Sequence, residues 1–155
     1  SLLLDRQINY LMNDKLNNKL PPFVNLGKLG VNFGMQGAQF TSTSTVAENQ
    51  SIAFPNYLHS IPNNNDNQDV VSMGTNSALL AKRVIDNTYQ VLAIQMLSLV
   101  QAIDYLRIEN SLSSKTKQAY RQIRDLVPVF AEDTIKYIEI KRIKEYICSR
   151  FVNFF

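Results

Sequence analysis

Apolar residues recur along the chain at the spacing of α-helices rather than of β-strands. In residues 2–16 they fall close to one helical face, and Leu20-Pro21-Pro22 ends this segment because proline lacks an amide donor and restricts the residue before it. The Thr- and Ser-rich residues 39–53 form a weaker helix that depends on close packing by its neighbours, and Phe54-Pro55 ends it. Turn-forming side chains then predict a surface loop over residues 62–69.

The longest predicted element is a helix from about Ser72 to Ile108, with no proline and one glycine near its start. Between Val91 and Leu106 its apolar residues point to every face, and a helix that is apolar all round has to be buried all round. About 35 residues span roughly 50 Å, whereas a compact chain of this length is about 40 Å across. The pattern therefore predicts that other chains, or a further part of this one, pack against this helix.

Two shorter helices complete the predicted fold. Serines that can serve as a cap precede the first, residues 115–126, and Val127-Pro128 ends it. An amphipathic helix then runs from about Asp133 to Phe151. The fold class is all-α, a helical bundle dominated by one long central helix.

The composition is that of one globular domain, because 45% of the 155 residues are hydrophobic. The single cysteine, Cys148, excludes a disulfide framework and a thiolate zinc cluster, and the single histidine, His59, excludes sites that need two imidazoles. We interpret His59 as a structural histidine and expect no metal. We also expect no membrane span, because the charge-free stretch between Asp86 and Asp104 contains several polar residues: Gln90, Gln95, Ser98 and Gln101.

Charge is concentrated in residues 115–150, which hold nine Lys or Arg against five Asp or Glu. Acidic residues interrupt the basic ones, so solvated helix faces explain this region better than a nucleic-acid surface does. A protein that binds DNA or anionic membranes through this region is the weakest alternative. The glycine-rich residues 27–37 lack the spacing of a phosphate-binding loop, so their glycines serve sharp backbone turns instead.

Several short motifs occur in order along the chain: Leu20-Pro21-Pro22-Phe23, Asn32-Phe33-Gly34-Met35-Gln36-Gly37-Ala38-Gln39, Ala47-Glu48-Asn49, Asn67-Gln68-Asp69-Val70-Val71-Ser72-Met73-Gly74, and Val127-Pro128 followed by Glu132-Asp133. Together they resemble the C-terminal third of the ammonia-lyases and aminomutases of aromatic amino acids, a family that includes the histidine, phenylalanine and tyrosine ammonia-lyases. The resemblance covers residues 1–155 and implies that this chain is the C-terminal helical segment of a larger enzyme.

The resemblance also implies a chemistry. These enzymes eliminate ammonia from an amino acid to give an α,β-unsaturated acid, using a methylidene-imidazolone (MIO) made from an internal Ala-Ser-Gly. No Ala-Ser-Gly occurs in this chain, so the MIO, the tyrosine base and the carboxylate-binding arginine are expected upstream. We therefore expect no catalytic residue here, no lyase activity in the isolated chain, and a cytoplasmic homotetramer that binds neither nucleic acid nor membrane.

The residues that match the substrate pocket of the family are Gln68, Asn64, Asn67 and Met35. Gln68 occupies a place that is Glu in histidine enzymes and Gln in phenylalanine and tyrosine enzymes. A neutral amide beside an aryl ring avoids burying an unpaired charge, whereas a carboxylate can pair with an imidazole. Met35 stands where most members have a phenylalanine. Helix capping and turn formation are the alternative roles for the amides, and ordinary core packing is the alternative for Met35.

The resemblance favours tyrosine or phenylalanine as the substrate of the full-length enzyme. A histidine ammonia-lyase or a 2,3-aminomutase of the same family is an alternative. A non-catalytic helical assembly module is another, and an Ala-Ser-Gly in the upstream part of the whole protein would distinguish the enzyme from the module.

Overall fold

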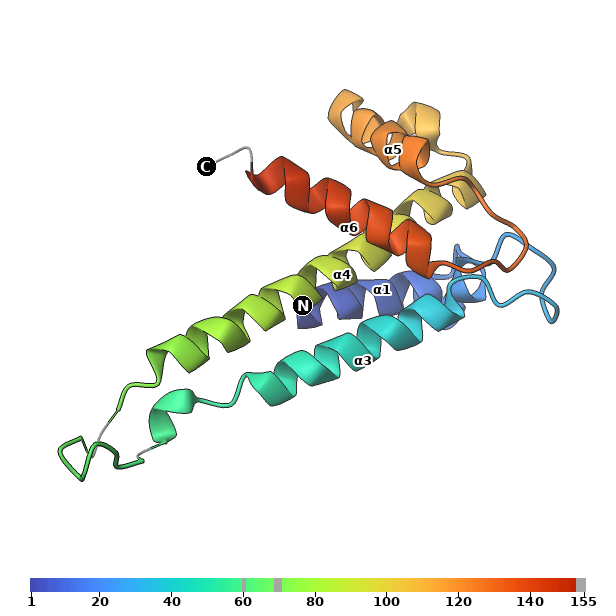
Figure 1. Cartoon of the computed structure of the whole chain (residues 1–155). Helices are drawn as coiled ribbons and strands as arrows, with labels where there is room; N and C mark the ends of the chain where they lie inside the picture. The colour runs from blue at the N-terminus through green and yellow to red at the C-terminus, as the bar shows by residue number, and fades with distance from the viewer. Residues whose placement is uncertain (60, 69–70, 153–155) are drawn as a thin grey trace.

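The computed structural model describes residues 1–59, 61–68 and 71–152, with side chains to Arg150 (Figure 1). Its helices are α1 (Leu2–Met12), α2 (Asp14–Asn17), α3 (Gln36–Ile52), α4 (Gly74–Leu106), α5 (Ser114–Leu126) and α6 (Tyr137–Val152). No β-strand occurs among these residues, so the predicted all-α class is confirmed. Asp69 and Val70, which belong to one of the motifs, lie outside the described residues.

The long helix α4 is the centre of the fold, as predicted (Figure 1). Helices α1, α3 and α6 lie along it and α5 packs near its C-terminal end. The residues that form the core come from all of these helices: Ile8, Met12, Val46, Val91, Ile94, Leu97, Ile123, Ile143 and Ile147. None of the helices within the described ranges is long and apolar enough to cross a membrane.

The burial of α4 differs from the prediction. Val91, Ile94 and Leu97 are 0% exposed in this single chain, so neighbouring helices of the same chain cover one side of the segment between Val91 and Leu106. Helices α1, α3 and α6 contact α4, and the covering of its remaining apolar surface by other chains stays a prediction. None of residues 74–86 is buried, with Leu79 63% and Ile85 57% exposed, whereas the second half mixes buried residues with Leu99 at 41% and Tyr105 at 44% exposed.

Two parts of the molecule therefore differ in how they are packed. We call residues 50–86 the arm: the end of α3, the connection after it, and the first half of α4. We call the remaining helices, with the second half of α4, the body. In Figure 1 the arm extends at the lower left, beyond α1, α5 and α6.

Side chains explain where two helices depart from their predicted bounds. The first predicted helix breaks at Asn13, whose side-chain oxygen accepts a hydrogen bond from the Lys15 amide at 3.1 Å and begins α2. Helix α6 begins at Tyr137 rather than at Asp133, because the Asp133 carboxylate accepts hydrogen bonds from the amides of Phe33 at 2.8 Å and Gly34 at 3.0 Å. Asp133 is therefore held beside the start of α3.

The basic residues of the C-terminal region form ion pairs on helix surfaces. Arg121 pairs with Glu109 at 3.0 Å, and Lys144 pairs with Asp86 at 2.8 Å. Lys136 pairs with Glu139 at 3.1 Å, and both side chains are mostly covered, at 11% and 14% exposed. These ion pairs place acidic side chains among the basic ones, in agreement with charge-balanced helix faces rather than with one continuous basic surface.

Candidate functional site

The polar loop at the tip of the arm has an unusual backbone. Asn64, Asn65 and Asp66 have φ angles of 55°, 55° and 62° in succession. The loop is closed by a pair of backbone hydrogen bonds, from the Asn63 amide to the Gln68 carbonyl at 2.9 Å and from the Gln68 amide to the Asn63 carbonyl at 3.3 Å. Asn and Asp are the non-glycine residues that enter the left-handed region most readily. The left-handed backbone of this loop therefore explains why Asn and Asp occur here, independently of what their side chains bind.

This loop brings three of the predicted site residues together. Asn64, Asn67 and Gln68 are all exposed. The alternative role of these amides as helix caps is not what the structure shows, because α4 begins after Met73 without a side-chain cap hydrogen bond. Their side chains are thus displayed at the surface of the arm.

Met35, the fourth predicted residue, lies elsewhere. It immediately precedes α3, at the end opposite the polar loop, and it is 0% exposed. A helix of 17 residues rises about 25 Å. The structure therefore does not bring Met35 and Gln68 together within one chain. Met35 packs in the core, and its contact with substrate stays a prediction.

A hollow of about 560 Å³ lies at the tip of the arm. Its lining combines polar and apolar side chains from both sides of the connection: Asn56, His59, Ile61, Met73, Asn76, Leu79 and Leu80. The His59 ring lies 6.3 Å from that of Phe54, centroid to centroid. Sequence reasoning did not select Asn56 and Asn76, because the sequence pattern does not show that the chain folds back to place one beside the other.

A second hollow, of about 730 Å³, lies on the body between the start of α3 and α6. Phe33, Ile135 and Tyr137 give it apolar walls, with Lys141 and Lys144 among the other lining residues. Both lysines face carboxylates, since Lys144 pairs with Asp86 and Lys141 lies 3.8 Å from Glu145. The lysine charges are therefore balanced within the chain.

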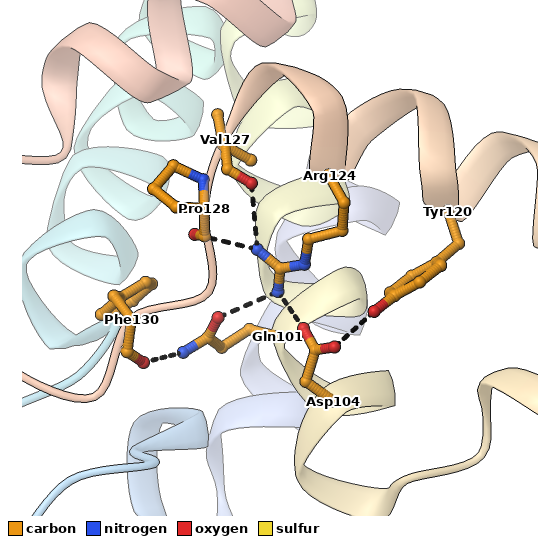
Figure 2. A network of polar contacts seen from close by, with 7 residues as sticks. All are labelled: Gln101, Asp104, Tyr120, Arg124, Val127, Pro128 and Phe130. Atoms are coloured by element: carbon orange, nitrogen blue, oxygen red, sulfur yellow. Dashed lines mark hydrogen bonds and ion pairs between the residues drawn. The ribbon is translucent and has the colours of Figure 1, made fainter.

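The most connected polar group belongs to the body and joins α4 to α5 (Figure 2). Arg124 forms an ion pair with Asp104 and donates to the Gln101 side-chain oxygen at 3.0 Å. It also donates to the Pro128 carbonyl at 3.1 Å, and Gln101 donates to the Phe130 carbonyl. This network docks α5 and the segment after it onto α4.

Tyr120 completes the network by donating its hydroxyl hydrogen to Asp104. Burial raises the pKa of Tyr120 above its usual value of 10, and the hydrogen bond and charge of Asp104 raise it further. The raised pKa keeps the phenol protonated, so Tyr120 serves as a hydrogen-bond donor to Asp104.

No cluster of three or more His, Cys, Asp or Glu side chains that could hold a metal ion occurs among the described residues. The sequence also has no Ala-Ser-Gly from which an MIO could be made. The residues of this chain therefore cannot form the MIO.

Comparison with known proteins defines the class. The sequence profile of the aromatic amino acid lyases matches residues 1–125. The chain is 42% identical over 132 residues to the MIO-dependent tyrosine 2,3-aminomutase of Streptomyces globisporus, covering 85% of this chain and 24% of the relative. It is 41% identical over 143 residues to the histidine ammonia-lyase of Natranaerobius thermophilus, covering 92% of this chain and 28% of the relative.

The solved structures agree with the sequence comparison. The crystal structure of the tyrosine aminomutase from Streptomyces globisporus superposes with a TM-score of 0.92 at 37% identity, covering 98% of this chain and 29% of that one. The fold is thus that of the all-α ammonia-lyases and aminomutases. The chain belongs to the aromatic amino acid lyase family, and it spans about a quarter of the length of the curated relatives that it matches.

Proposed function

We propose that this chain supplies one wall of the substrate pocket in a full-length ammonia-lyase that acts on tyrosine or phenylalanine. The observation that carries the proposal is the polar loop, which displays Gln68 with Asn64 and Asn67 at the tip of the arm. A loop closed at both ends and held in a left-handed turn presents its side chains in a defined direction, which is what a binding site requires.

Gln68 favours an aryl substrate over histidine. The relatives named above include a tyrosine aminomutase and a histidine ammonia-lyase at almost equal identity, so identity does not select the substrate. The chemistry of position 68 supports an aryl substrate. A neutral amide can lie beside an aryl ring, or donate to a phenol oxygen, without burying an unpaired charge. A histidine substrate would be better matched by a carboxylate.

The cofactor of the proposed enzyme comes from a part of the whole protein outside this chain. One relative is named as MIO-dependent, and an MIO supplies an electrophile for the amine of the substrate. The residues of this chain would orient the side chain of the substrate and exclude water from it. We infer the elimination of ammonia, with migration of the amine as the alternative within the family.

Assembly of several copies is part of the proposal. The arm exposes large apolar side chains, with Tyr57 80%, Leu79 63% and Phe54 60% exposed. Patches of this kind mark surfaces that associate. If both Met35 and Gln68 contact substrate, they come from different copies, because α3 separates them by about 25 Å. A homotetramer, as implied by the family resemblance, would satisfy both observations.

The test is Gln68→Glu in the full-length protein that carries this chain. We expect kcat/KM for tyrosine and phenylalanine to fall about 5- to 150-fold, equivalent to about 1–3 kcal/mol, because the variant places an unpaired charge beside an aryl ring. Gln118→Glu makes the same chemical change at an exposed position on α5 and serves as the matched control. Unchanged kcat/KM in Gln68→Glu would show that this residue does not line the pocket.

A non-catalytic assembly module is the second candidate, and the exposed apolar arm is the observation that favours it. The module and the enzyme differ in one measurable result. Incubation of the full-length protein with phenylalanine, tyrosine or histidine yields an α,β-unsaturated acid only if the protein is an enzyme, and the absorbance of that acid reports it.

A further inference from the structure

The motif Ala47-Glu48-Asn49 lies on the side of α3 that faces α4. Oε1 of Glu48 accepts hydrogen bonds from Arg83, at 3.0 Å from Nη2 and 3.3 Å from Nε. Oε2 of the same carboxylate accepts one from Nδ2 of Asn87 at 2.8 Å. Nδ2 of Asn87 also donates to Oδ1 of Asn49 at 2.9 Å. We call Glu48, Asn49, Arg83 and Asn87 the clamp.

The clamp lies where the arm meets the body. Its two amide residues are buried, with Asn49 4% and Asn87 6% exposed. At the same level of α4, Asp86 pairs with Lys144 of α6 at 2.8 Å. The clamp and this ion pair therefore join α3, α4 and α6 at the base of the arm.

Beyond the clamp, the two sides of the arm are joined less tightly. An exposed hydrogen bond from Asn56 to Ser77, at 3.2 Å, links the connection after α3 to α4. A groove of about 390 Å³ lies between the end of α3 and the first half of α4, lined by residues that include Ile52, Leu80 and Ile85. Because few contacts hold the two sides of the arm together, we expect the angle of the arm relative to the body to depend on the clamp.

We propose that the clamp sets the angle of the arm and thereby places Gln68, with Glu48 and Asn87 as positioning residues. This inference rests on the proposed function, in which Gln68 contacts the substrate. It also gives a physical role to the Ala47-Glu48-Asn49 motif, which is not among the proposed substrate contacts.

The length of the arm turns a small tilt at the clamp into a larger displacement at the tip of the arm. From Asn87 to the start of α4 at Gly74 is about 13 residues, or about 20 Å of helix. A tilt of about 3° at the clamp therefore moves the start of α4 by about 1 Å. A misplacement of that size in a catalytic constellation can lower the rate by about a hundredfold.

The composition of the clamp supports positioning over simple stabilisation. Nδ2 of Asn49 is buried and has no hydrogen-bond partner within the described part of the chain. A buried polar cluster that is only partly satisfied stabilises a fold less than apolar residues of similar shape would. Apolar contacts allow helices to slide, whereas directional hydrogen bonds between Glu48 and Asn87 define one register.

The test uses reciprocal substitutions in the full-length protein. Asn87→Asp places a carboxylate against Glu48, and we expect kcat to fall at least tenfold, with a smaller change in KM because the substrate still binds but is misaligned. The Glu48→Gln/Asn87→Asp double variant lets an amide at position 48 donate to the new carboxylate. We expect it to recover most of the lost kcat.

Glu109→Gln is the matched control. The Arg121–Glu109 pair has the same 3.0 Å distance as Arg83–Glu48, with side-chain exposures of 63% and 38% against 60% and 43%, and it lies away from the arm. We expect it to leave kcat within twofold of the parent. Hydrogen exchange should accelerate in residues 74–83 of Asn87→Asp while exchange in α5 stays unchanged.

The outcomes separate this proposal from the proposed function. Loss of activity in Gln68→Glu, without loss in Asn87→Asp or Glu48→Gln, overturns the clamp and leaves the substrate contact standing. Loss in Asn87→Asp with rescue, but none in Gln68→Glu, overturns Gln68 as the contact and with it the placing of Gln68, and supports only the effect of the clamp on the angle of the arm. If Asn87→Asp does not fold, Glu48→Gln alone decides, and unchanged kcat and unchanged exchange in the arm overturn the proposal.

Discussion

The two halves of α4 belong to one continuous helix and yet have opposite surroundings. In the body, Ile94 and Leu97 are 0% exposed, and the polar side chains around Arg124 are paired with one another. In the arm, Leu79 is 63% exposed. The comparison shows that the sequence of a helix determines which side chains are apolar, whereas the tertiary fold determines which of them the same chain covers.

The difference between body and arm also predicts which residues stabilise the fold and which serve binding. The body contains the core and the network that docks α5, so its residues hold the fold together. The arm contributes little to that core and displays the polar loop and an apolar surface. We expect substitutions in the body to alter unfolding, and substitutions in the arm to alter association and substrate use.

The largest expected contrast is between two leucines of the same helix. Leu97→Ala should lower the free energy of unfolding by about 2–5 kcal/mol, because it leaves a cavity in a packed core. Leu79→Ala changes an exposed side chain and should stay within about 0.5 kcal/mol in the monomer. Urea denaturation of dilute isolated chain, followed by circular dichroism, measures both. Equal losses would contradict the division into body and arm.

A second contrast compares two ion pairs. Asp104→Ala leaves Arg124 without its carboxylate in a mostly buried site, where the side chains are 15% and 11% exposed, and should cost about 3 kcal/mol. Glu109→Ala removes half of an exposed pair and should cost less than about 1 kcal/mol. The same denaturation experiment applies. A cost for Asp104→Ala no greater than that for Glu109→Ala would mean that the network in Figure 2 does not dock α5.

Tyr120 gives a smaller effect that depends on pH. Its pKa is raised in the folded chain by burial and by Asp104, so above about pH 10 the unfolded state loses the phenol proton first. The contribution of Tyr120 to stability is thus fully present below pH 10 and declines as pH rises further. Thermal unfolding from pH 8 to 11 should show a shallower decline in Tyr120→Phe than in the parent. Identical slopes would argue against the raised pKa.

The sequence predicted the elements of the fold better than their surroundings. Proline and serine signals located the ends of α5, and the uninterrupted apolar run located α4, because these features act through local backbone chemistry. The start of α6 was placed too early, since Asp133 binds amides about a hundred residues away. A contact of that kind leaves no periodic signal in the sequence.

For the candidate site, the sequence predicted the polar loop but not the distances between the site residues. The motif around Gln68 located the polar loop, and its Asn and Asp residues are the ones that tolerate the observed left-handed backbone. The separation of Met35 from Gln68 was not foreseen, because motif order does not give distance. The hollow that Asn56 and Asn76 line depends on how the chain folds back at the tip of the arm, which is likewise a tertiary property.

Sedimentation equilibrium of the isolated chain at micromolar concentration tests the central claim most directly, namely that the exposed apolar side chains of the arm are covered by another chain. Leaving several large apolar side chains in water disfavours the free arm by about 1.5–3 kcal/mol each relative to burial. We predict a mass above that of the monomer, which returns to the monomer mass when Tyr57 and Leu79 are replaced by serine. A folded monomer of the parent chain over this concentration range would contradict the account.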